Sequence, residues 1–338
     1  EVLGPDGLPQ AANELDLGAV AVPTHRPAAT QRPVARFPYN FGDGRKLYCS
    51  LLASCDGLLL IRQCVQQYLV FNPATWQWSD LPRLSRDALP QGARVVLLES
   101  GFYFHGPSGE FRLLCHVSYD EFSAKAPYYC VFSAGAKEPR RLGVQATPME
   151  QTVATDHSMP TSGFFKNLMT PAVLHGQLHW LQHMEAGVTD HMVAFDTAAE
   201  TFRRMPPPPV TCKKHSHLLL ADGSLMVAEL GHLFMDLWLL EGYGGGAAEG
   251  TWERRHRLDM RWLVRMPLLV ASGDGGDVIL GHNQGVVAYN LRSGMVRQVV
   301  GADESLRLSQ YVFRESLIRH GFFEARKHTG LRLFRLRA

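Results

Sequence analysis

The stretch Tyr68 to Pro82, YLVFNPATWQWSDLP, has the pattern of a β-hairpin, and its outline returns four more times along the chain. An apolar, β-rich run precedes the turn-forming residues Asn-Pro-Ala-Thr, and a second such run follows them and ends at a proline. A single hairpin is only marginally stable in water, so each copy needs a neighbour to cover its apolar face. The repeat therefore predicts a fold built from several similar β units.

The copies share a fixed spacing of their apolar anchors. In the first copy Phe71 is followed by Trp78 seven residues later and by Leu81 ten residues later. The same two intervals occur in three further copies, and a looser fifth copy carries a glycine-rich insertion. The anchors of these copies are Phe132 with Pro139 and Leu142, Phe195 with Phe202 and Met205, Tyr289 with Val296 and Val299, and, in the looser copy, Leu237 to Leu240 with Trp252 to Leu258.

The distance between copies is typical of a β-propeller. The anchors Phe71, Phe132, Phe195 and Tyr289 are separated by 61, 63 and 94 residues, and the last interval contains the looser copy. Each unit also holds a second pair of short apolar runs around a turn, as in LLASCDGLLLI and PAVLHGQLHWL. Periods of roughly 40 to 50 residues with several strands each are typical of propellers, and the last interval averages about 47 residues per unit. We therefore predict an all-β fold, a kelch-like β-propeller.

We predict six blades, with seven as the alternative. Residues 46–338 would form a single propeller domain, and residues 1–45, which are rich in Pro and Ala, would form a linker or edge segment. After Gly301 only the runs SQYVFRESLIRH and GLRLFRLRA have strand character, which is too little for a complete blade. Strands from both termini are therefore expected to pair and close the ring, because this would protect both edges.

The composition limits the cellular compartment and the class of partner that we expect. The formal net charge is +2 and the basic residues are scattered, apart from the C-terminal LRLFRLRA, so we expect no nucleic-acid binding. Six cysteines without a Cys-x-x-Cys pair are too few for a disulfide scaffold. We also find no signal peptide, no apolar run long enough to span a membrane and no N-glycosylation motif. These features predict a protein of the cytoplasm or nucleus that does not bind membranes.

The order and spacing of these segments resemble one known family. SCDGLLLI, YLVFNPATWQWSDLP, PAVLHGQLHWL, VAFDTAAETFRRMP and YVFRESLI, within roughly Lys46 to Arg319, are similar to the F-box-associated domain of plant F-box proteins. GPSGEFRLLCH resembles grass members of that family. The resemblance implies a propeller-like domain that holds a protein substrate for an SCF-type cullin-RING ubiquitin ligase.

The F-box itself, which docks on a Skp-type adaptor in that family, is not found in this sequence. Glu1 to Asn40 shows neither a Leu-Pro helical opening nor an amphipathic three-helix pattern. We expect either that an F-box precedes Glu1 in the full protein or that this copy has lost it. Contacts with a Skp-type adaptor and a cullin would then require an F-box outside this chain.

Two clusters of potential metal ligands are better explained without a metal. His175, His179 and His183 are spaced by four residues, with His191 beyond, but Gly176 places them in a strand-turn-strand pattern rather than on a helix. Packed or partly exposed histidines are the favoured interpretation. A second group has no matching pair elsewhere in the chain and comprises Cys212, His215 and His217.

No catalytic motif stands out, and we expect neither a metal nor an organic cofactor. The chain has no Gly-x-Ser-x-Gly elbow, no Walker loop and no His-Glu-x-x-His motif. The glycine-rich stretch Gly242 to Gly250 lacks the Lys-Ser/Thr of a phosphate loop and is predicted to be a hairpin tip. The tryptophans follow the strand positions of the repeat, so we expect them to pack in the core; they are Trp76, Trp78, Trp180, Trp238, Trp252 and Trp262.

Three functions are compatible with this sequence. The favoured one is a non-catalytic domain that recruits a protein target to a ubiquitin ligase. The alternatives are a kelch-like propeller enzyme of the lyase or oxidase type, which would need convergent polar residues at the central channel, and a stand-alone interaction adaptor without ligase coupling. Fold alone does not distinguish them, because propellers host all three.

The long connections of the second and third units predict where a protein target binds. In a four-stranded blade, the connection between the second and third strands and the connection to the next blade leave from the same face. Residues 145–170, YDEFSAKAP and HMEAGVTDH would therefore form one surface that mixes aromatic and charged side chains, as protein interfaces do. The candidate binding residues are Tyr119, Phe122, His157, Met159, Phe164, Phe165, Lys166 and Glu185.

Overall fold

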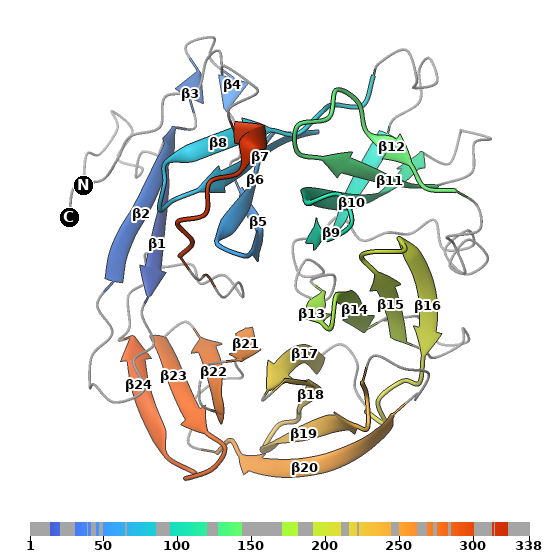
Figure 1. Ribbon diagram of the computed structural model, residues 1–338. Helices are drawn as coiled ribbons and strands as arrows, with labels where there is room; N and C mark the ends of the chain where they lie inside the picture. The colour runs from blue at the N-terminus through green and yellow to red at the C-terminus, as the bar shows by residue number, and fades with distance from the viewer. Residues whose placement is uncertain are drawn as a thin grey trace.

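Five four-stranded antiparallel sheets are arranged around a centre in the computed structural model of the chain (Figure 1). Each sheet is one blade, and its first strand in sequence lies nearest the centre (Figure 1). The all-β propeller prediction is therefore confirmed. The structure describes residues 14–20, 31–38, 40–41, 45–46, 50–64, 66–85, 95–119, 128–143, 171–181, 192–210, 216–221, 223–244, 250–261, 269–272, 276–282, 285–300, 313 and 315–323.

The blades follow one another along the chain. Blade 1 consists of β5 (Ser50–Cys55), β6 (Leu58–Cys64), β7 (Gln67–Asn72) and β8 (Gln77–Asp80). Blade 2 consists of β9 (Val95–His105), β10 (Glu110–Tyr119), β11 (Tyr128–Ser133) and β12 (Arg140–Arg141). Blade 3 consists of β13 (Ala172–Leu174), β14 (Gln177–Leu181), β15 (Met192–Asp196) and β16 (Thr201–Met205).

The last two blades have the same strand order. Blade 4 consists of β17 (Ser216–Ala221), β18 (Ser224–Leu230), β19 (Phe234–Glu241) and β20 (Thr251–Asp259). Blade 5 consists of β21 (Leu269–Ser272), β22 (Asp277–His282), β23 (Gly285–Asn290) and β24 (Val296–Val300). Outside the blades lie β1 (Glu14–Val20), β2 (Gln31–Pro38), β3 (Asn40–Phe41), β4 (Arg45–Lys46) and the short 3-10 helix η6 (Gly321–Phe323).

The seven-residue spacing corresponds to direct pairing across the outer hairpin of a blade. Phe71 lies opposite Trp78, and the corresponding anchors of blades 3 and 5 pair in the same way. The turn between the paired strands is fixed by its first side chain. Oδ1 of Asn72 accepts hydrogen bonds from the backbone N–H groups of Ala74 and Thr75, at 3.0 and 3.3 Å. Asp196 and Asn290 make equivalent turns in blades 3 and 5.

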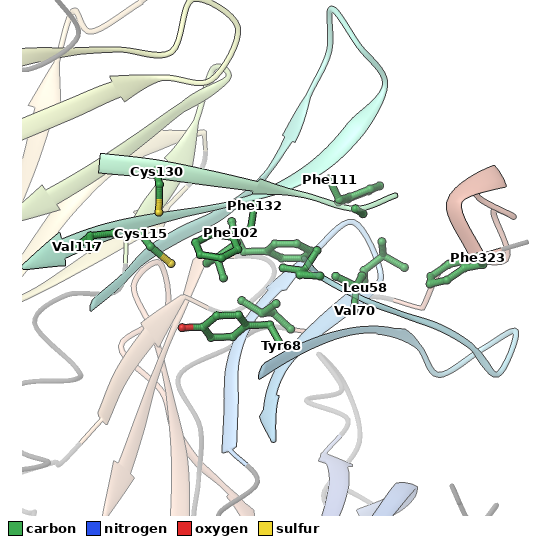
Figure 2. Close-up of a cluster of buried hydrophobic side chains, with 14 residues drawn as sticks. Leu58, Tyr68, Val70, Phe102, Phe111, Cys115, Val117, Cys130, Phe132 and Phe323 are labelled. Carbon is green, nitrogen blue, oxygen red and sulfur yellow. The ribbon is translucent and has the colours of Figure 1, made fainter. Parts of the chain in front are cut away.

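The core lies between the blades rather than inside any one of them. Between blades 1 and 2, the ring of Tyr68 meets that of Phe132 edge-on, with centroids 5.8 Å apart (Figure 2). Between blades 2 and 3, Tyr103 meets Phe195 in the same way, at 5.6 Å. These aromatic anchors are almost fully buried. Each blade is therefore stabilised by the apolar faces of its neighbours, as the marginal stability of a single hairpin requires.

The prediction of six blades, one of them shared between the termini, with seven as the alternative, is wrong because the described residues form five. The two-stranded sheet of β1 and β2 lies between blade 5 and blade 1 in the ring (Figure 1). Blades 1 and 5 each have one face that does not pack against blade 2 or blade 4. Apolar side chains on these faces are buried as well; they are Leu59, Ile61, Leu69, Phe71, Ile279, Val286 and Ala288. Between blades 5 and 1, the described residues therefore form two strands, where a complete blade has four. These strands, and those of β3 and β4, fall within or next to the expected linker or edge segment 1–45.

The longest strand and the C-terminal segment are set by pairing and docking. β9 continues through Ser100 to His105 because its residues pair with the start of β10. Near the C-terminus, residues 315–320 were expected to be part of a strand, but they have no strand partner within the described chain. They dock on blade 1 through side-chain contacts instead. The C-terminal run 331–338 lies outside the described residues.

Candidate functional site

The strand order defines two faces of the ring. Neighbouring strands of each blade are antiparallel, so the links from second to third strand and from fourth strand to the next blade leave from one face. We call this the connection face, and the face with the tight hairpin turns the turn face. The ends of β10, β12 and β14 lie on the connection face, as predicted from the topology.

Of the predicted binding residues, one lies within the described part of the chain. Tyr119 is the last residue of β10 and is half-buried on the connection face. Its side chain packs against the core between blades 1 and 2. The other predicted binding residues lie outside the described part of the chain; they are Phe122, His157, Met159, Phe164, Phe165, Lys166 and Glu185.

The structure adds two residues to this position. The rings of Tyr119 and Tyr128 lie 6.4 Å apart, and the guanidinium carbon of Arg141 lies 4.4 Å from the centre of the Tyr128 ring. Burial and the side-chain hydrogen bond with Tyr119 raise the pKa of Tyr128 to about 12, so the Tyr128 hydroxyl is neutral near pH 7. This arrangement offers hydroxyl donors, aromatic faces and one oriented cation, which are features of protein-binding surfaces.

The turn face carries a charge network between blades 2 and 3. Oε1 of Glu200 accepts from the hydroxyl of Tyr103 at 2.8 Å and from Nη1 of Arg112 at 2.7 Å, and Oε2 accepts from Arg140. Arg112 also pairs with Glu110 at 2.6 Å. Burial alone would raise the pKa of Glu200, but hydrogen bonds from Tyr103, Arg140 and Arg112 outweigh it and the pKa is lowered. Because these groups bind one another, the network holds two blades together.

The predicted histidine cluster is divided by the fold. His175 is exposed in the β13–β14 turn, whereas His179 is fully buried in β14, and His183 lies outside the described residues. Nδ1 of His179 lies 3.2 Å from the carbonyl oxygen of Ala172 and Nε2 lies 2.7 Å from the hydroxyl of Tyr243 in blade 4. His179 therefore joins blades 3 and 4, in agreement with the expected packing role.

Metal and membrane sites can be assessed only where the chain is described. There, no three His, Cys, Asp or Glu side chains are grouped so that they could hold a metal ion. Of the second predicted cluster, Cys212 and His215 lie outside the described residues, whereas His217 is in β17. The same portion of the chain contains no helix long and apolar enough to cross a bilayer.

Trp180, Trp238 and Trp252 pack as expected, whereas Trp76 lies in the β7–β8 turn with its ring 5.6 Å from that of Phe71, and Trp262 lies outside the described residues. Trp180 lies against the core between blades 2 and 3, and Trp238 and Trp252 lie against the core between blades 3 and 4. The indole N–H of Trp180 donates to the carbonyl oxygen of Ser100, at 2.9 Å, across the blade junction. These contacts support a packing role rather than a ligand-binding one.

A C-terminal segment is fastened to the turn face of blades 1 and 2. The fully buried Asn72 donates from Nδ2 to the carbonyl oxygens of Ser316 and Ile318, at 3.0 and 3.4 Å. Further along, the ring of His320 meets that of Phe111 at 4.9 Å, and Phe323 enters the core between the two blades (Figure 2). The chain therefore returns to its first blades after completing the fifth.

We expect Asn72→Asp to release this segment selectively. The aspartate keeps the oxygen that caps the β7–β8 turn, as Asp196 does in blade 3, but it loses the donor and places negative charge beside two carbonyl oxygens. The expected loss in free energy of unfolding is about 1 to 3 kcal/mol. Hydrogen exchange should quicken at Ser316 to Phe323 and stay unchanged there in the matched control Asp196→Asn. Unchanged exchange in both variants would contradict this fastening.

Sequence reasoning found Tyr119 but missed Tyr128 and Arg141. Tyr128 begins β11 and Arg141 ends β12, so the three residues come together only through the register of three strands. The sequence feature that could have indicated Arg141 is the Arg-Arg pair in the predicted fourth strand of the second unit. Neighbouring residues of a strand point to opposite faces, so the two arginines must face different blades. Arg140 points to blade 3, where it meets Glu200, so Arg141 points toward blade 1.

Comparisons with known proteins add similarity of fold only. The sequence matches no protein-family model and no curated protein. The structure is similar to the β-propeller domain of Cps50 (Swd1) from Myceliophteria thermophila, with 12% identity, 82% of this chain and 78% of that one covered, and a TM-score of 0.40. For the Dos1 propeller the values are 11%, 80%, 66% and 0.35. For the PQQ-bound aldose sugar dehydrogenase of Streptomyces coelicolor they are 11%, 76%, 84% and 0.28. At such scores and identities these similarities say nothing about what the chain binds.

Proposed function

We propose that this propeller is a non-catalytic recognition domain that binds a protein target on its connection face. The observation that carries the proposal is the convergence of the ends of β10, β12 and β14 on one face of blades 2 and 3, each followed by a long connection. Long connections on a rigid scaffold are where propellers and other repeat folds place their binding residues. The half-buried Tyr119 and the stacked pair of Tyr128 and Arg141 provide anchors at the base of this surface.

We further propose that the target is recruited to an SCF-type cullin-RING ubiquitin ligase. The support is the resemblance of the repeat segments, from Lys46 to Arg319, to the F-box-associated domain of plant F-box proteins. A Skp-type adaptor and a cullin would be reached through an F-box outside residues 1–338, in the cytoplasm or nucleus. In this arrangement the chemistry of ubiquitin transfer belongs to other subunits and the propeller supplies selection.

Substitution on each face tests the binding surface. The full-length protein is purified from its own cells with its bound partner, and the affinity for that partner is then measured for two variants. The double variant Phe164→Ala, Phe165→Ala is expected to weaken binding about tenfold or more, as loss of an aromatic anchor does. A variant with Ala247→Arg and Ala248→Arg, in the stretch Gly242 to Gly250 on the turn face, should bind normally. If the Phe164, Phe165 double variant binds normally and the Ala247, Ala248 variant does not, with both variants folded, the target binds the turn face and the proposal is contradicted.

Ligase coupling is tested separately. If the proposal holds, the purified complex contains a Skp-type adaptor and a cullin, and inhibition of cullin neddylation lengthens the half-life of the partner. A partner recovered without adaptor or cullin, with an unchanged half-life, would support the stand-alone adaptor instead. Turnover of a small molecule by the purified protein would support the propeller enzyme.

A further inference from the structure

The connection face carries a polar rim where blade 1 meets blade 2. We call it the blade 1–2 rim; it consists of Arg83, Leu84, Tyr119, Tyr128 and Arg141. These residues lie at the end of β8, the end of β10, the start of β11 and the end of β12, all of which open on the connection face. The side chains of Leu84, Tyr119 and Tyr128 pack against the same core cluster. Three of the rim residues therefore border one core cluster although they are distant in sequence.

The cation of Arg141 is oriented and has no counter-charge among the described residues. Its guanidinium is stacked on Tyr128, and no described carboxylate pairs with it. Arg203 on β16 is similar, since it lies over the ring of Tyr243 and donates to Gln177. Most other arginines of the outermost strands have described ion pairs: Arg140 with Glu200, Arg255 with Glu241, Arg257 with Asp236 and Arg297 with Asp277.

The opposite side of the rim is also positive. Arg83 is exposed, and its guanidinium donates to the side-chain oxygen of Gln67, an uncharged group, at 2.9 and 3.1 Å. Glu99 of β9, a carboxylate at the same blade junction, already accepts from Arg62 and from the Tyr68 hydroxyl, both at 3.0 Å. Arg83 and Arg141 are therefore both exposed, and neither pairs with a carboxylate of the described residues.

We propose that the blade 1–2 rim binds an acidic peptide segment of the partner protein. The inference deepens the proposed function and rests on it, since it names the chemistry of the protein that the domain recognises. A peptide carboxylate meets Arg141, whose orientation is already fixed by stacking, so little side-chain entropy is lost on binding. The tyrosine hydroxyls and Arg83 provide further donors. Leu84 provides the apolar surface for a neighbouring side chain of the peptide.

A peptide fits the rim better than a nucleic acid does. Nucleic-acid binding depends on many cations along a backbone, whereas the whole chain has a formal net charge of only +2 and the rim has two arginines. The two arginines of the rim and the apolar Leu84 suit a peptide in which acidic and apolar side chains alternate. Single-stranded DNA is nevertheless included in the experiment as a competing ligand.

Selection from a displayed library of random twelve-residue peptides on the immobilised full chain tests the inference. The peptides enriched by the native chain should carry Asp or Glu at two or more positions, and their affinity should fall as salt rises from about 50 to 500 mM. Arg141→Gln and Arg83→Gln should each weaken these peptides about tenfold. The matched control Arg319→Gln removes an exposed arginine of the segment fastened to the turn face and should have no effect. Circular dichroism verifies that each variant is folded.

The outcomes separate the inference from the proposed function. Enriched peptides that bind Arg141→Gln and the native chain equally, or that lack acidic residues, overturn the inference and leave a protein-binding domain with a different site. Peptides displaced by single-stranded DNA at equal concentration also overturn it. Failure to enrich any peptide above background contradicts the inference and the protein-binding function together.

Discussion

Lowering the pH from 7 to 4 is expected to remove about 6 kcal/mol from the free energy of unfolding through two buried histidines, about 3 kcal/mol each. Burial lowers the pKa of His116 to about 4. Burial, together with the nearby Arg203 cation, lowers that of His179 to about 4. The unfolded chain takes up a proton on each imidazole near pH 6.5, whereas the folded chain resists protonation. Stability should therefore be complete above pH 6.5 and fall as the pH decreases toward 4.

The contribution of His116 can be isolated because its environment is apolar and aromatic. Its ring lies 5.0 Å from that of Tyr129, and it is almost fully buried. His116→Phe keeps a ring of similar size and removes the titrating group. Urea unfolding at pH 7, 6, 5 and 4 should then show a loss of stability smaller by about half in the variant. Equal losses in both proteins would show that His116 is not held neutral by the fold.

Glu200→Ala is expected to lower the free energy of unfolding by about 3 to 5 kcal/mol, because it leaves a buried cation without part of its counter-charge. The side chains of Glu200 and Arg112 are only 10% and 11% exposed, and the pair is 2.7 Å apart. The substitution also removes the acceptor of the Tyr103 hydroxyl at the junction of blades 2 and 3.

Arg140→Ala is the matched control for this network. Arg140 binds the other oxygen of Glu200, but its side chain is 54% exposed. Exposed ion pairs contribute about 0 to 1 kcal/mol, so its loss should be small. Chemical unfolding of both variants at pH 7 compares them directly. Similar losses in the two variants would show that burial of the pair does not determine its contribution.

The outer hairpins could be predicted from sequence because their signals are local. The interval from Phe71 to Trp78 sets a direct strand pair, and Asn72 fixes the turn between them. The two features recur together in blades 1, 3 and 5, whereas blade 2 repeats the spacing and blade 4 only a looser outline of two strands around a turn. The end of β9 at His105 depends on pairing with β10, which no local pattern indicates.

The number of blades and the C-terminal docking depend on contacts between distant parts of the chain. Strand propensity predicted a strand at residues 315–320. Their backbone carbonyl groups instead accept hydrogen bonds from the side chain of Asn72, and such side-chain contacts produce no periodic pattern in a sequence. Similarly, propensity does not show that the described residues form two strands, and not four, between blades 5 and 1. Closure of the ring is decided by which chain segment reaches the gap.

The sequence predicted on which face the end of β10 lies better than it predicted which residues meet there. Topology correctly put the end of β10 on the face shared with the long connections, which made Tyr119 a candidate. Arg141 was missed because its importance is its unmatched charge, and the partners of the neighbouring arginines become visible only in three dimensions. The remaining predicted residues, including Phe164 and Phe165, stay predictions.

Hydrogen exchange on the complex with the purified partner tests most directly whether the connection face is the binding surface. Bound and free protein are compared after a short exchange, followed by digestion and mass spectrometry. The proposed site predicts slower exchange in the complex at the end of β10, the start of β11 and the end of β12, which contain Tyr119, Tyr128 and Arg141. Exchange at the turn-face segment from Thr197 to Glu200 should be unchanged. Protection of that turn, with no change at the three strand ends, would contradict a target-binding connection face.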